Sequence, residues 1–271
     1  MSPDALRFHA LGGECALFAV GVAPARLEWG RRWVLARHAR FSRFEPGSEL
    51  SSLNRAAGRW TEVSDELEAM LRSALEAHTA SGGLVHAGVL HAMLAIGYTR
   101  PLAAGPTAAS APPRPPPPLP EMLEVSAGRA RLRPGTGLDL GGIAKGWLAD
   151  RLASELGSNV LVNLAGDLFA RGPGPAGRGW PVGMGGVTVM LRDRGAATSG
   201  TWRRRWRSRG RVLHHLIDPR SGGPAQTDLV EASAVAETAC QAEVDAKAAL
   251  LLGSRGAPGY LSSRAPAWSL R

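Results

Sequence analysis

Only two of the 32 basic residues in this chain are lysines, and their positions indicate chemistry with phosphate. Lys145 lies in D-L-G-G-I-A-K-G (139–146), and Lys247 lies in A-E-V-D-A-K-A-A (242–249). Elsewhere the chain uses arginine for its positive charge, so a lysine indicates a site that needs a compact ammonium acting as a point charge. The alternative is chance placement in a composition rich in arginine, alanine and glycine. We favour the functional interpretation.

The glycines of G-T-G-L-D-L-G-G-I-A-K-G (135–146) precede a predicted helix. Glycines let backbone amides approach an anion, and the start of a helix carries partial positive charge. Asp139 lies on the entering strand or turn. Lys145 lies in the first helical turn, where an ammonium is unfavourable unless an anion or a carboxylate compensates it. The segment therefore predicts a phosphate site, although its spacing matches neither of the common glycine-rich phosphate motifs.

Three further segments combine polar side chains with turns. V-N-L-A-G-D (162–167) ends a predicted strand and places Asn163 and Asp167 near one edge, although for this segment alone the better explanation is that Gly166 and Asp167 form the turn. A-T-S-G-T-W (197–202) supplies hydroxyls and a glycine. H-H-L-I-D-P-R-S-G-G (214–223) brings a histidine and an aspartate into a turn rich in proline and glycine. Together the segments indicate a binding site more strongly than any one of them alone.

The 271-residue chain has a formal net charge of +9, which favours anionic partners such as nucleotides, nucleic acid or an acidic protein surface. The densest basic run is W-R-R-R-W-R-S-R-G-R (202–211), where Trp202 and Trp206 interrupt the arginines. Such a run could stack the bases of a nucleic acid. A hairpin with solvated arginines outside and both indoles packed inside is the simpler interpretation. Nucleic-acid binding is therefore only a rival function.

Composition also bounds the class of protein. With 44% apolar residues, the chain can fill the core of one large domain. The sequence has neither an apolar run of about 18 residues nor a charged start followed by an apolar run, which predicts no membrane span and a cytoplasmic location. Cys15 and Cys240 are too few for a disulfide framework or a zinc site, so we expect reduced thiols.

Apolar periodicity and turn residues predict an α+β fold with mostly antiparallel sheet and packed helices. Helices dominate the first third of the chain, after a buried strand at 16–21. They are expected at about 25–44, from Ser64 to Gly82, and at 86–96. Further along, short strands are predicted at 122–126, 129–133, 159–164, 187–191, 211–217 and 229–236, with helices at 142–156 and 239–252.

Residues 101–120 contain P-P-R-P-P-P-P-L-P and are predicted to form a flexible, extended loop. Prolines lack the amide donors that helices and sheets need, so neither element is expected there. A tolerated loop insertion is the preferred explanation, and a polyproline ligand for a partner protein is the alternative.

The ordered motifs of the chain resemble those of the FAD:protein FMN transferases, a family of flavin-trafficking enzymes. The resemblance spans nearly the whole chain, and its specificity comes from the number of motifs that occur in the same order. These motifs are F-H-A-L-G-G-E-C (8–15), F-S-R-F-E-P-G-S-E-L-S-S-L-N (41–54), D-L-G-G-I-A-K-G (139–146), V-N-L-A-G-D (162–167), A-T-S-G (197–200), H-L-I-D-P-R-S-G (215–222) and A-E-V-D-A-K-A-A-L-L-L-G (242–253).

This resemblance implies a single domain over residues 1–271 with two lobes, similar to the tunnelling fold (T-fold), that holds FAD between the lobes. It implies a magnesium-dependent transfer of FMN from FAD to a Thr or Ser hydroxyl of a client flavoprotein, with release of AMP. By position it implies that Ala144 and Glu243 bind the metal and that His215, Asp218 and Lys247 are catalytic. The implied cofactor-binding residues are Leu11, Asp139, Lys145, Asn163, Asp167, Ser199, Gly200 and Ile217.

The late helix departs from the pattern that the resemblance implies, which has an Asp and a Thr at the magnesium ion. This chain has Glu243 and Lys247 there, and a charged lysine offers no lone pair to a metal. We predict that the Lys247 ammonium supplies part of the metal's charge. The alternative is an ordinary surface ion pair between Glu243 and Lys247. Asp245 projects from the opposite side of the helix and is a poor substitute ligand.

Two other positions differ from the family's usual residues: His86 replaces an acid and Leu11 replaces a methionine. The leading interpretation is an FMN transferase. The first rival is a non-catalytic FAD-binding protein, or an FAD hydrolase, of the same fold, and it is favoured by the lost metal ligand. The second and weaker rival is a basic nucleic-acid-binding module built on residues 202–211.

Overall fold

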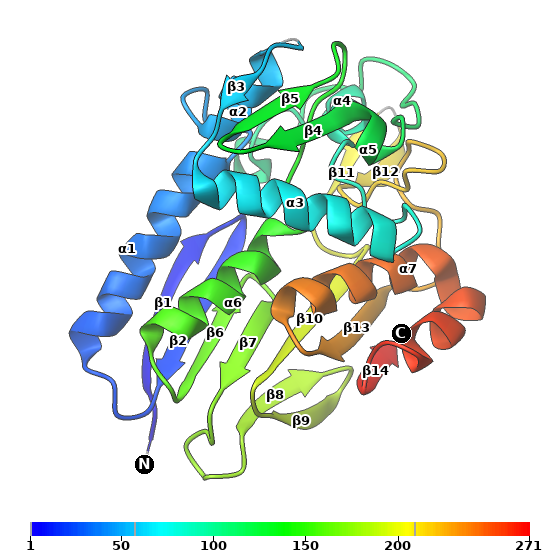
Figure 1. Cartoon of the computed structure of the whole chain (residues 1–271). Helices are drawn as coiled ribbons and strands as arrows, with labels where there is room; N and C mark the ends of the chain where they lie inside the picture. The colour runs from blue at the N-terminus through cyan, green and yellow to red at the C-terminus, as the bar shows by residue number, and fades with distance from the viewer. Residues whose placement is uncertain (1, 57, 209) are drawn as a thin grey trace. The chain divides into compact units, whose positions relative to one another are not determined.

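A computed structural model describes residues 2–56, 58–208 and 210–271 of the chain. These residues divide into two units, each built from more than one stretch of sequence. Unit 1 takes the described residues of 1–38, 144–199 and 229–271, and unit 2 takes those of 39–143 and 200–228. Figure 1 shows the helices and strands.

Unit 1 is built on a seven-stranded sheet. Two of its hairpins have two-residue loops, Leu11-Gly12 and Ala165-Gly166, in which both residues have positive φ. Turns of this kind match the right-handed twist of the paired strands. The strand order is β1 (Asp4–Ala10), β2 (Gly13–Ala19), β6 (Val160–Leu164), β7 (Asp167–Arg171), β10 (Arg194–Gly200), β13 (Glu231–Ala236) and β14 (Ala267–Leu270). The pairs β1–β2, β2–β6, β6–β7, β7–β10 and β13–β14 are antiparallel.

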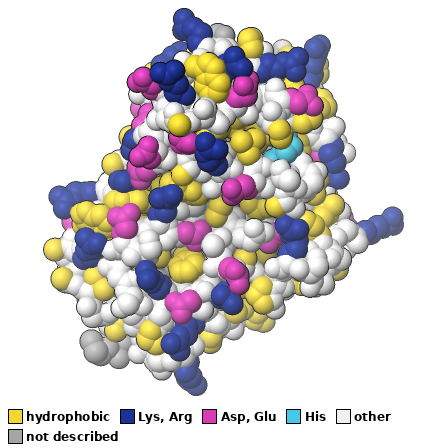
Figure 2. All heavy atoms as spheres, in the orientation of Figure 1, with side chains coloured by type: hydrophobic (Ala, Val, Ile, Leu, Met, Phe, Trp, Pro, Cys, Tyr) yellow, Lys and Arg dark blue, Asp and Glu magenta, His cyan; other side chains and the backbone are white. Residues whose placement is uncertain are grey.

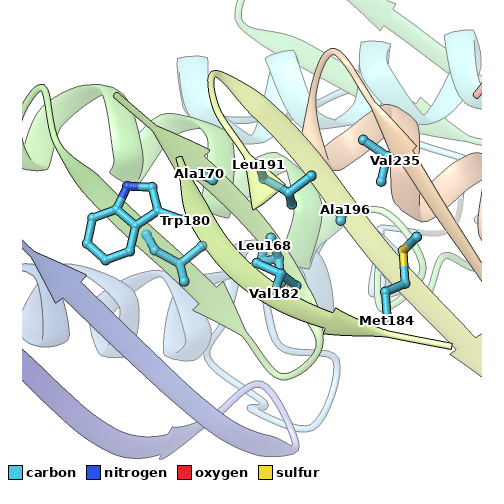
Figure 3. Packing of buried hydrophobic residues seen from close by; sticks show 9 residues of the cluster. Leu168, Ala170, Trp180, Val182, Met184, Leu191, Ala196 and Val235 are labelled. Carbon is cyan, nitrogen blue, oxygen red and sulfur yellow. The ribbon is translucent and has the colours of Figure 1, made fainter. Parts of the chain in front are cut away.

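The two faces of this sheet are covered by different elements. Helices α6 (Ala144–Leu156) and α7 (Ala239–Ser262) pack against β6, β7 and β13. Successive side chains of a strand point to opposite faces, and the alternate set packs against a separate hairpin of β8 (Trp180–Met184) and β9 (Val187–Leu191). Figure 3 shows Trp180, Val182 and Met184 of this hairpin beside Leu168, Ala170 and Ala196 of the sheet.

Unit 2 combines short helices with two small sheets. An apolar cluster forms around α4 and includes Tyr98, Trp206 and Ile217. The first part of α1 (Pro24–Phe41) belongs to unit 1, because the boundary falls after His38. The other elements of unit 2 are α2 (Glu49–Arg55), α3 (Asp65–Ala80), α4 (Leu90–Ala95), η1 (Leu102–Ala104), α5 (Leu119–Met122), the three-stranded sheet β3 (Thr61–Glu62), β5 (Arg129–Leu132) and β4 (Leu123–Ser126), and the hairpin β11 (Arg205–Ser208) and β12 (Arg211–His214).

The predicted α+β class and the mostly antiparallel sheet are confirmed. Ser64 caps α3 as expected, because its hydroxyl accepts the Leu67 amide at 3.2 Å. The expected helix at 86–96 is wrong at its start, since α4 begins at Leu90. There the His86 imidazole accepts the Gly88 amide at 2.9 Å and forms a tight turn instead of a helix.

The Pro-rich segment 101–120 contains two short helices that the sequence did not predict. They are η1 and α5, and they fall where proline does not obstruct a helix: η1 contains none, and Pro120 of α5 lies in the first turn, where no amide donor is needed. Between them the chain is extended and is bonded to unit 2, with the Thr107 and Ser110 amides donating to Gly97 and Ala95 at 2.9 Å each. The flexibility of this segment stays a prediction.

The basic excess does not form a single field on the face drawn in Figure 2, where Lys and Arg side chains are scattered among Asp and Glu. Within the described part of the chain, every helix is too short or too polar to span a bilayer.

Candidate functional site

The strongest polar cluster of unit 1 lies at the start of α6. The Lys145 ammonium forms an ion pair with Asp167, at the start of β7, and lies 3.0 Å from Oε1 of Glu243 on α7. The Asp167 and Glu243 side chains are each 3% exposed and that of Lys145 is 14% exposed. Two carboxylates therefore supply the compensation that a lysine in a first helical turn requires.

Glu243 also joins α7 to the backbone of α6. Its Oε2 accepts the Gly146 amide at 2.9 Å. A side chain at position 146 would not fit, because a Cβ there would lie 2.5 Å from the Ala239 carbonyl oxygen. The close approach of α6 and α7 thus places a backbone donor and the Lys145 ammonium on one buried carboxylate.

Asp150 provides a second link between the same helices, and the sequence reasoning missed it. Its two carboxylate oxygens accept the Ala239 amide at 2.7 Å and the Cys240 amide at 3.0 Å, at the start of α7. Burial raises the pKa of Asp150 to about 6, and the charge of Glu243 adds to the rise, although the two amide bonds act against it. An acid inside a predicted helix gave no signal that it caps another helix.

Asp245 faces away from this cluster, as predicted. It is fully buried and accepts hydrogen bonds from Gln241 at 2.8 Å, Tyr260 at 3.0 Å and Arg264 at 3.0 Å. The idea of an ordinary surface ion pair between Glu243 and Lys247 is wrong for its acidic member, because Glu243 is only 2% exposed. Lys247 is partly buried, one helical turn after Glu243.

The other predicted residues of unit 1 are more dispersed. Asn163 and Asp167 lie on opposite faces of the sheet, because Asn163 pairs with Leu168 while Asp167 pairs with Leu164. Asn163 accepts the Gly166 amide at 3.0 Å and so stabilises the turn. The two turn residues are Ala165 and Gly166, which corrects the alternative that placed Asp167 in the turn. Leu11 donates its amide to His38 at 2.7 Å, and Ser199 is buried in β10.

In unit 2, Asp139 forms an ion pair with Arg43 that is buried on both sides. The Arg43 guanidinium also donates to the Tyr98 carbonyl at 2.9 Å, and it lies 4.0 Å from the ring centre of Phe44 and 4.7 Å from that of Tyr98. Sequence reasoning missed Arg43, although it stands between two phenylalanines in F-S-R-F. Its combination of a charge pair and ring contacts fixes the Asp139 carboxylate in place.

The segment 214–223 of unit 2 forms a tight loop. Asp218 is held by Arg220, whose Nη2 lies 2.8 Å from Oδ2. Ile217 is buried in the apolar cluster around α4, and His215 is partly buried. Gly222 has φ 72°, and a Cβ there would lie 2.1 Å from the backbone of Arg114 in the Pro-rich segment. Gly200, the last residue of β10, is partly buried.

The basic run 202–211 forms the β11–β12 hairpin, with Arg209 outside the described residues. The expectation that both indoles pack inward is confirmed for Trp206, which is 6% exposed, and wrong for Trp202, which is 43% exposed. Trp206 lies within a strand that faces the core, whereas Trp202 precedes the strand.

Three comparisons place this geometry among known proteins. The sequence pattern of the ApbE family matches residues 30–268. An FAD:protein FMN transferase of Treponema pallidum (strain Nichols) is 36% identical over 140 residues, which are 44% of this chain and 39% of that protein. The chain spans less than half the length of the curated relatives that it matches.

Solved structures show the same fold. The ApbE protein of Thermotoga maritima superimposes with a TM-score of 0.79 at 22% identity, over 93% of this chain and 87% of that one. The apo form of the flavinyl transferase ApbE of Pseudomonas stutzeri gives a TM-score of 0.80 at 20% identity, over 96% of this chain and 87% of that one.

Proposed function

Because the chain belongs to the ApbE family, we propose that it is an FAD:protein FMN transferase. The observation that carries the proposal is the match of residues 30–268 to the ApbE family. The site that we assign to it contains Lys145, whose ammonium Asp167 and Glu243 hold at the start of α6.

The proposed reaction joins a Thr or Ser hydroxyl oxygen of a client flavoprotein to the FMN-side phosphorus of FAD. The bond between that phosphorus and the bridging oxygen breaks, AMP leaves with the bridging oxygen, and the hydroxyl proton passes to the leaving phosphate or to water. Charge develops on the diphosphate oxygens, so catalysis rests on cations and amides that are already in place.

In unit 1, Lys145 and Lys247 would neutralise this charge. Lys145 is supported by its anchored position, and Asp167 acts by holding that ammonium. Leu11, Asn163 and Ser199 are proposed as contacts to the nucleotide. The least supported is Asn163, because it already stabilises a turn on the sheet face opposite to that of Asp167.

In unit 2, Asp139, Gly200 and Ile217 are proposed to contact the nucleotide, and His215 and Asp218 are proposed as catalytic residues. The support for Asp139 is its fixed carboxylate beside Arg43, and that for Asp218 is its pairing with Arg220. A carboxylate that is held in one position can orient a hydroxyl or a ring N–H without first reorganising.

The donor set does not fit the magnesium ion that the resemblance implies. Glu243 has one oxygen on the Gly146 amide and the other beside Lys145, and Lys247 carries donors only. Among the described residues, no three His, Cys, Asp or Glu side chains are grouped as metal ligands. The positive charge that a metal would supply is therefore assigned to the Lys247 ammonium.

Mixing the purified protein with FAD and a client protein, or a Thr-containing peptide, tests this function by the release of AMP and the yellow labelling of the acceptor. We expect AMP release to persist in a chelator such as EDTA. The variant Lys247→Thr should be slower by about 10- to 100-fold without metal and should regain activity when magnesium is added. Equal magnesium dependence of the parent and Lys247→Thr would exclude the role given to Lys247.

A non-catalytic FAD-binding protein is the second candidate. The resemblance implies a metal at Glu243, but the Gly146 amide already binds that carboxylate, and loss of the metal would favour a protein that binds FAD without catalysis. Flavin that copurifies with the protein, together with absence of AMP release under all metal conditions, would favour this candidate. AMP release without acceptor would instead identify an FAD hydrolase.

A further inference from the structure

The β11–β12 hairpin of unit 2 is firmly anchored on one side. The Trp206 indole donates to the Ile96 carbonyl at 3.2 Å, and its ring centre lies 5.5 Å from that of Tyr98. Two residues further along the same strand, the Ser208 hydroxyl accepts the Ala109 amide at 3.2 Å. These inward side chains fix one side of the hairpin against the apolar cluster around α4, so the opposite side of the hairpin faces away from that cluster.

The other side of the hairpin exposes positive charge that the rest of the described chain does not neutralise. Arg205 and Arg207 lie on this side, and Arg203 precedes the strand. All three are exposed, and within the described residues none of them forms an ion pair. Exposed arginines elsewhere are of both kinds, since Arg72 pairs with Glu68 whereas Arg129 has no ion pair among the described residues, so the hairpin differs by holding three unpaired arginines within five residues.

Apolar surface accompanies these arginines. Val212 is 44% exposed and lies opposite Arg207 in the antiparallel pair, and Trp202 is 43% exposed. A chain with 23 acidic residues leaves these three arginines without an acidic partner, while two large apolar side chains are exposed beside them. This combination is typical of a surface that binds another macromolecule of opposite charge.

We propose that this face, formed by Trp202, Arg203, Arg205, Arg207 and Val212 and called the basic hairpin, docks an acidic segment of the client protein. The proposal rests on the proposed function, because it assigns a partner to the same transfer reaction. Carboxylates of the client pair with the arginines, and an apolar side chain of the client packs on Val212.

A protein partner fits these side chains better than a nucleic acid does. Binding of single strands uses several exposed rings on which successive bases stack, and here one of the two indoles is buried. The remaining ring, that of Trp202, already has the Arg203 guanidinium 4.5 Å from its centre. Val212 offers apolar contact but no face for stacking, which suits a peptide side chain.

The test compares two synthetic peptides, each with one acceptor Thr and a fluorescent label. The first carries Asp and Glu around the Thr, and the second carries Asn and Gln at the same positions. Binding is measured by fluorescence anisotropy, which needs no catalysis, and AMP release is measured in parallel. The variant is Arg203→Glu, Arg205→Glu and Arg207→Glu combined. Its matched control is Arg59→Glu, Arg129→Glu and Arg133→Glu, an equal charge change at exposed arginines of the same unit.

We expect the parent and the control variant to bind the acidic peptide at least about tenfold more tightly than the neutral one, with an affinity that falls as salt is added. The hairpin variant should lose this preference, and its affinity for FAD should not change. Equal binding of the acidic peptide by the two variants would overturn the proposal. So would tighter binding of a single-stranded oligothymidine than of the peptide at about 0.15 M salt, since that result indicates a nucleic-acid site.

The two readouts separate this proposal from the proposed function. If the parent prefers the acidic peptide in the binding assay but releases no AMP under any condition, the docking surface stands and the transfer reaction fails. If AMP is released with the same KM for both peptides, the reaction stands and the docking surface fails.

Discussion

Two buried ion clusters, one in each unit, stabilise their carboxylates in different ways. In unit 1, one ammonium lies between Asp167 and Glu243, and backbone amides complete the arrangement. In unit 2, the guanidinium of Arg43 meets a single carboxylate, that of Asp139, and packs on two aromatic rings. A lysine can be shared because its ammonium is compact, whereas an arginine works through the plane of its fork. At the start of α6 one compact charge therefore serves two acids that are both buried. In unit 2, Arg40 also pairs with two acids, Glu49 and Glu66, but these side chains are 28% and 22% exposed.

Removing the shared charge is the most severe test of this comparison. In Lys145→Met, two buried carboxylates lose their common counter-ion, and we expect the free energy of unfolding to fall by about 3–5 kcal/mol. Urea unfolding monitored by circular dichroism measures the loss.

Arg7→Met is the matched control within unit 1. Arg7 is paired with Glu14, but both side chains are more than half exposed, so a change below about 1 kcal/mol is expected. If the two variants unfold at the same urea concentration, then the cluster does not depend on Lys145 for charge compensation.

The second test uses pH, because a buried acid of unit 1 and a buried imidazole of unit 2 have pKa values shifted in opposite directions. Burial raises the pKa of Asp150 from 3.8 to about 6, and burial lowers the pKa of His86 from 6.5 to about 4, aided by the nearby His78. Protonated Asp150 therefore adds to the free energy of unfolding below pH 3.8, and this contribution is lost as the pH rises to about 6. Neutral His86 favours folding above pH 6.5 and loses its contribution as the pH falls to about 4.

We expect Asp150→Asn and His86→Gln to change the pH dependence of stability with opposite signs, each by up to roughly 3 kcal/mol between pH 4 and pH 6.5. The measurement is urea unfolding at several pH values, with each variant compared with the parent so that other groups cancel. Asp150→Asn should gain stability relative to the parent as the pH rises, and His86→Gln should lose it. Differences of the same sign would show that one pKa shift is wrongly assigned.

The smallest effect concerns the shape of the cation in unit 2. Arg43→Lys keeps the charge beside Asp139 but loses the planar contact with Phe44 and Tyr98, so we expect a loss of about 1–2 kcal/mol of stability. Thermal unfolding would show the change. Arg131→Lys is the control, because that exposed arginine also has a carboxylate and a ring, Glu124 and Trp60, and its replacement should cost almost nothing.

Much of unit 1 was predictable because rare residues and glycines mark it. Lysine is scarce in this chain, which marks Lys145 as unusual. An ammonium in the first turn of a helix requires a nearby acid, and the structure supplies two, Asp167 on β7 and Glu243 on α7. Helix α6 ends just before Gly157, as predicted, whereas α7 continues to Ser262 and is only kinked at Gly253, which has φ 71°.

Other features could not be found because their signals are tertiary. Arg43 is one of 30 arginines, and nothing in the chain distinguishes it until Phe44, Tyr98 and Asp139 surround it. Strand β10 reads R-G-A-A-T-S-G, a sequence of small residues with little strand propensity, and it becomes a strand because β7 pairs with it. Trp202 differs from Trp206 only in lying outside the strand register.

The way the sheet of unit 1 draws strands from both ends of the chain has a consequence for biosynthesis. Strands β1 and β2 leave the ribosome early, but β13, α7 and β14 are made only after residue 228, when all of unit 2 has been synthesised. Unit 2 can therefore fold while β10 of unit 1 still lacks its neighbour β13, and such long-range pairing is slow. A nascent chain paused after residue 228 would carry a complete unit 2 and an open sheet edge at β10, which is prone to pair with other chains.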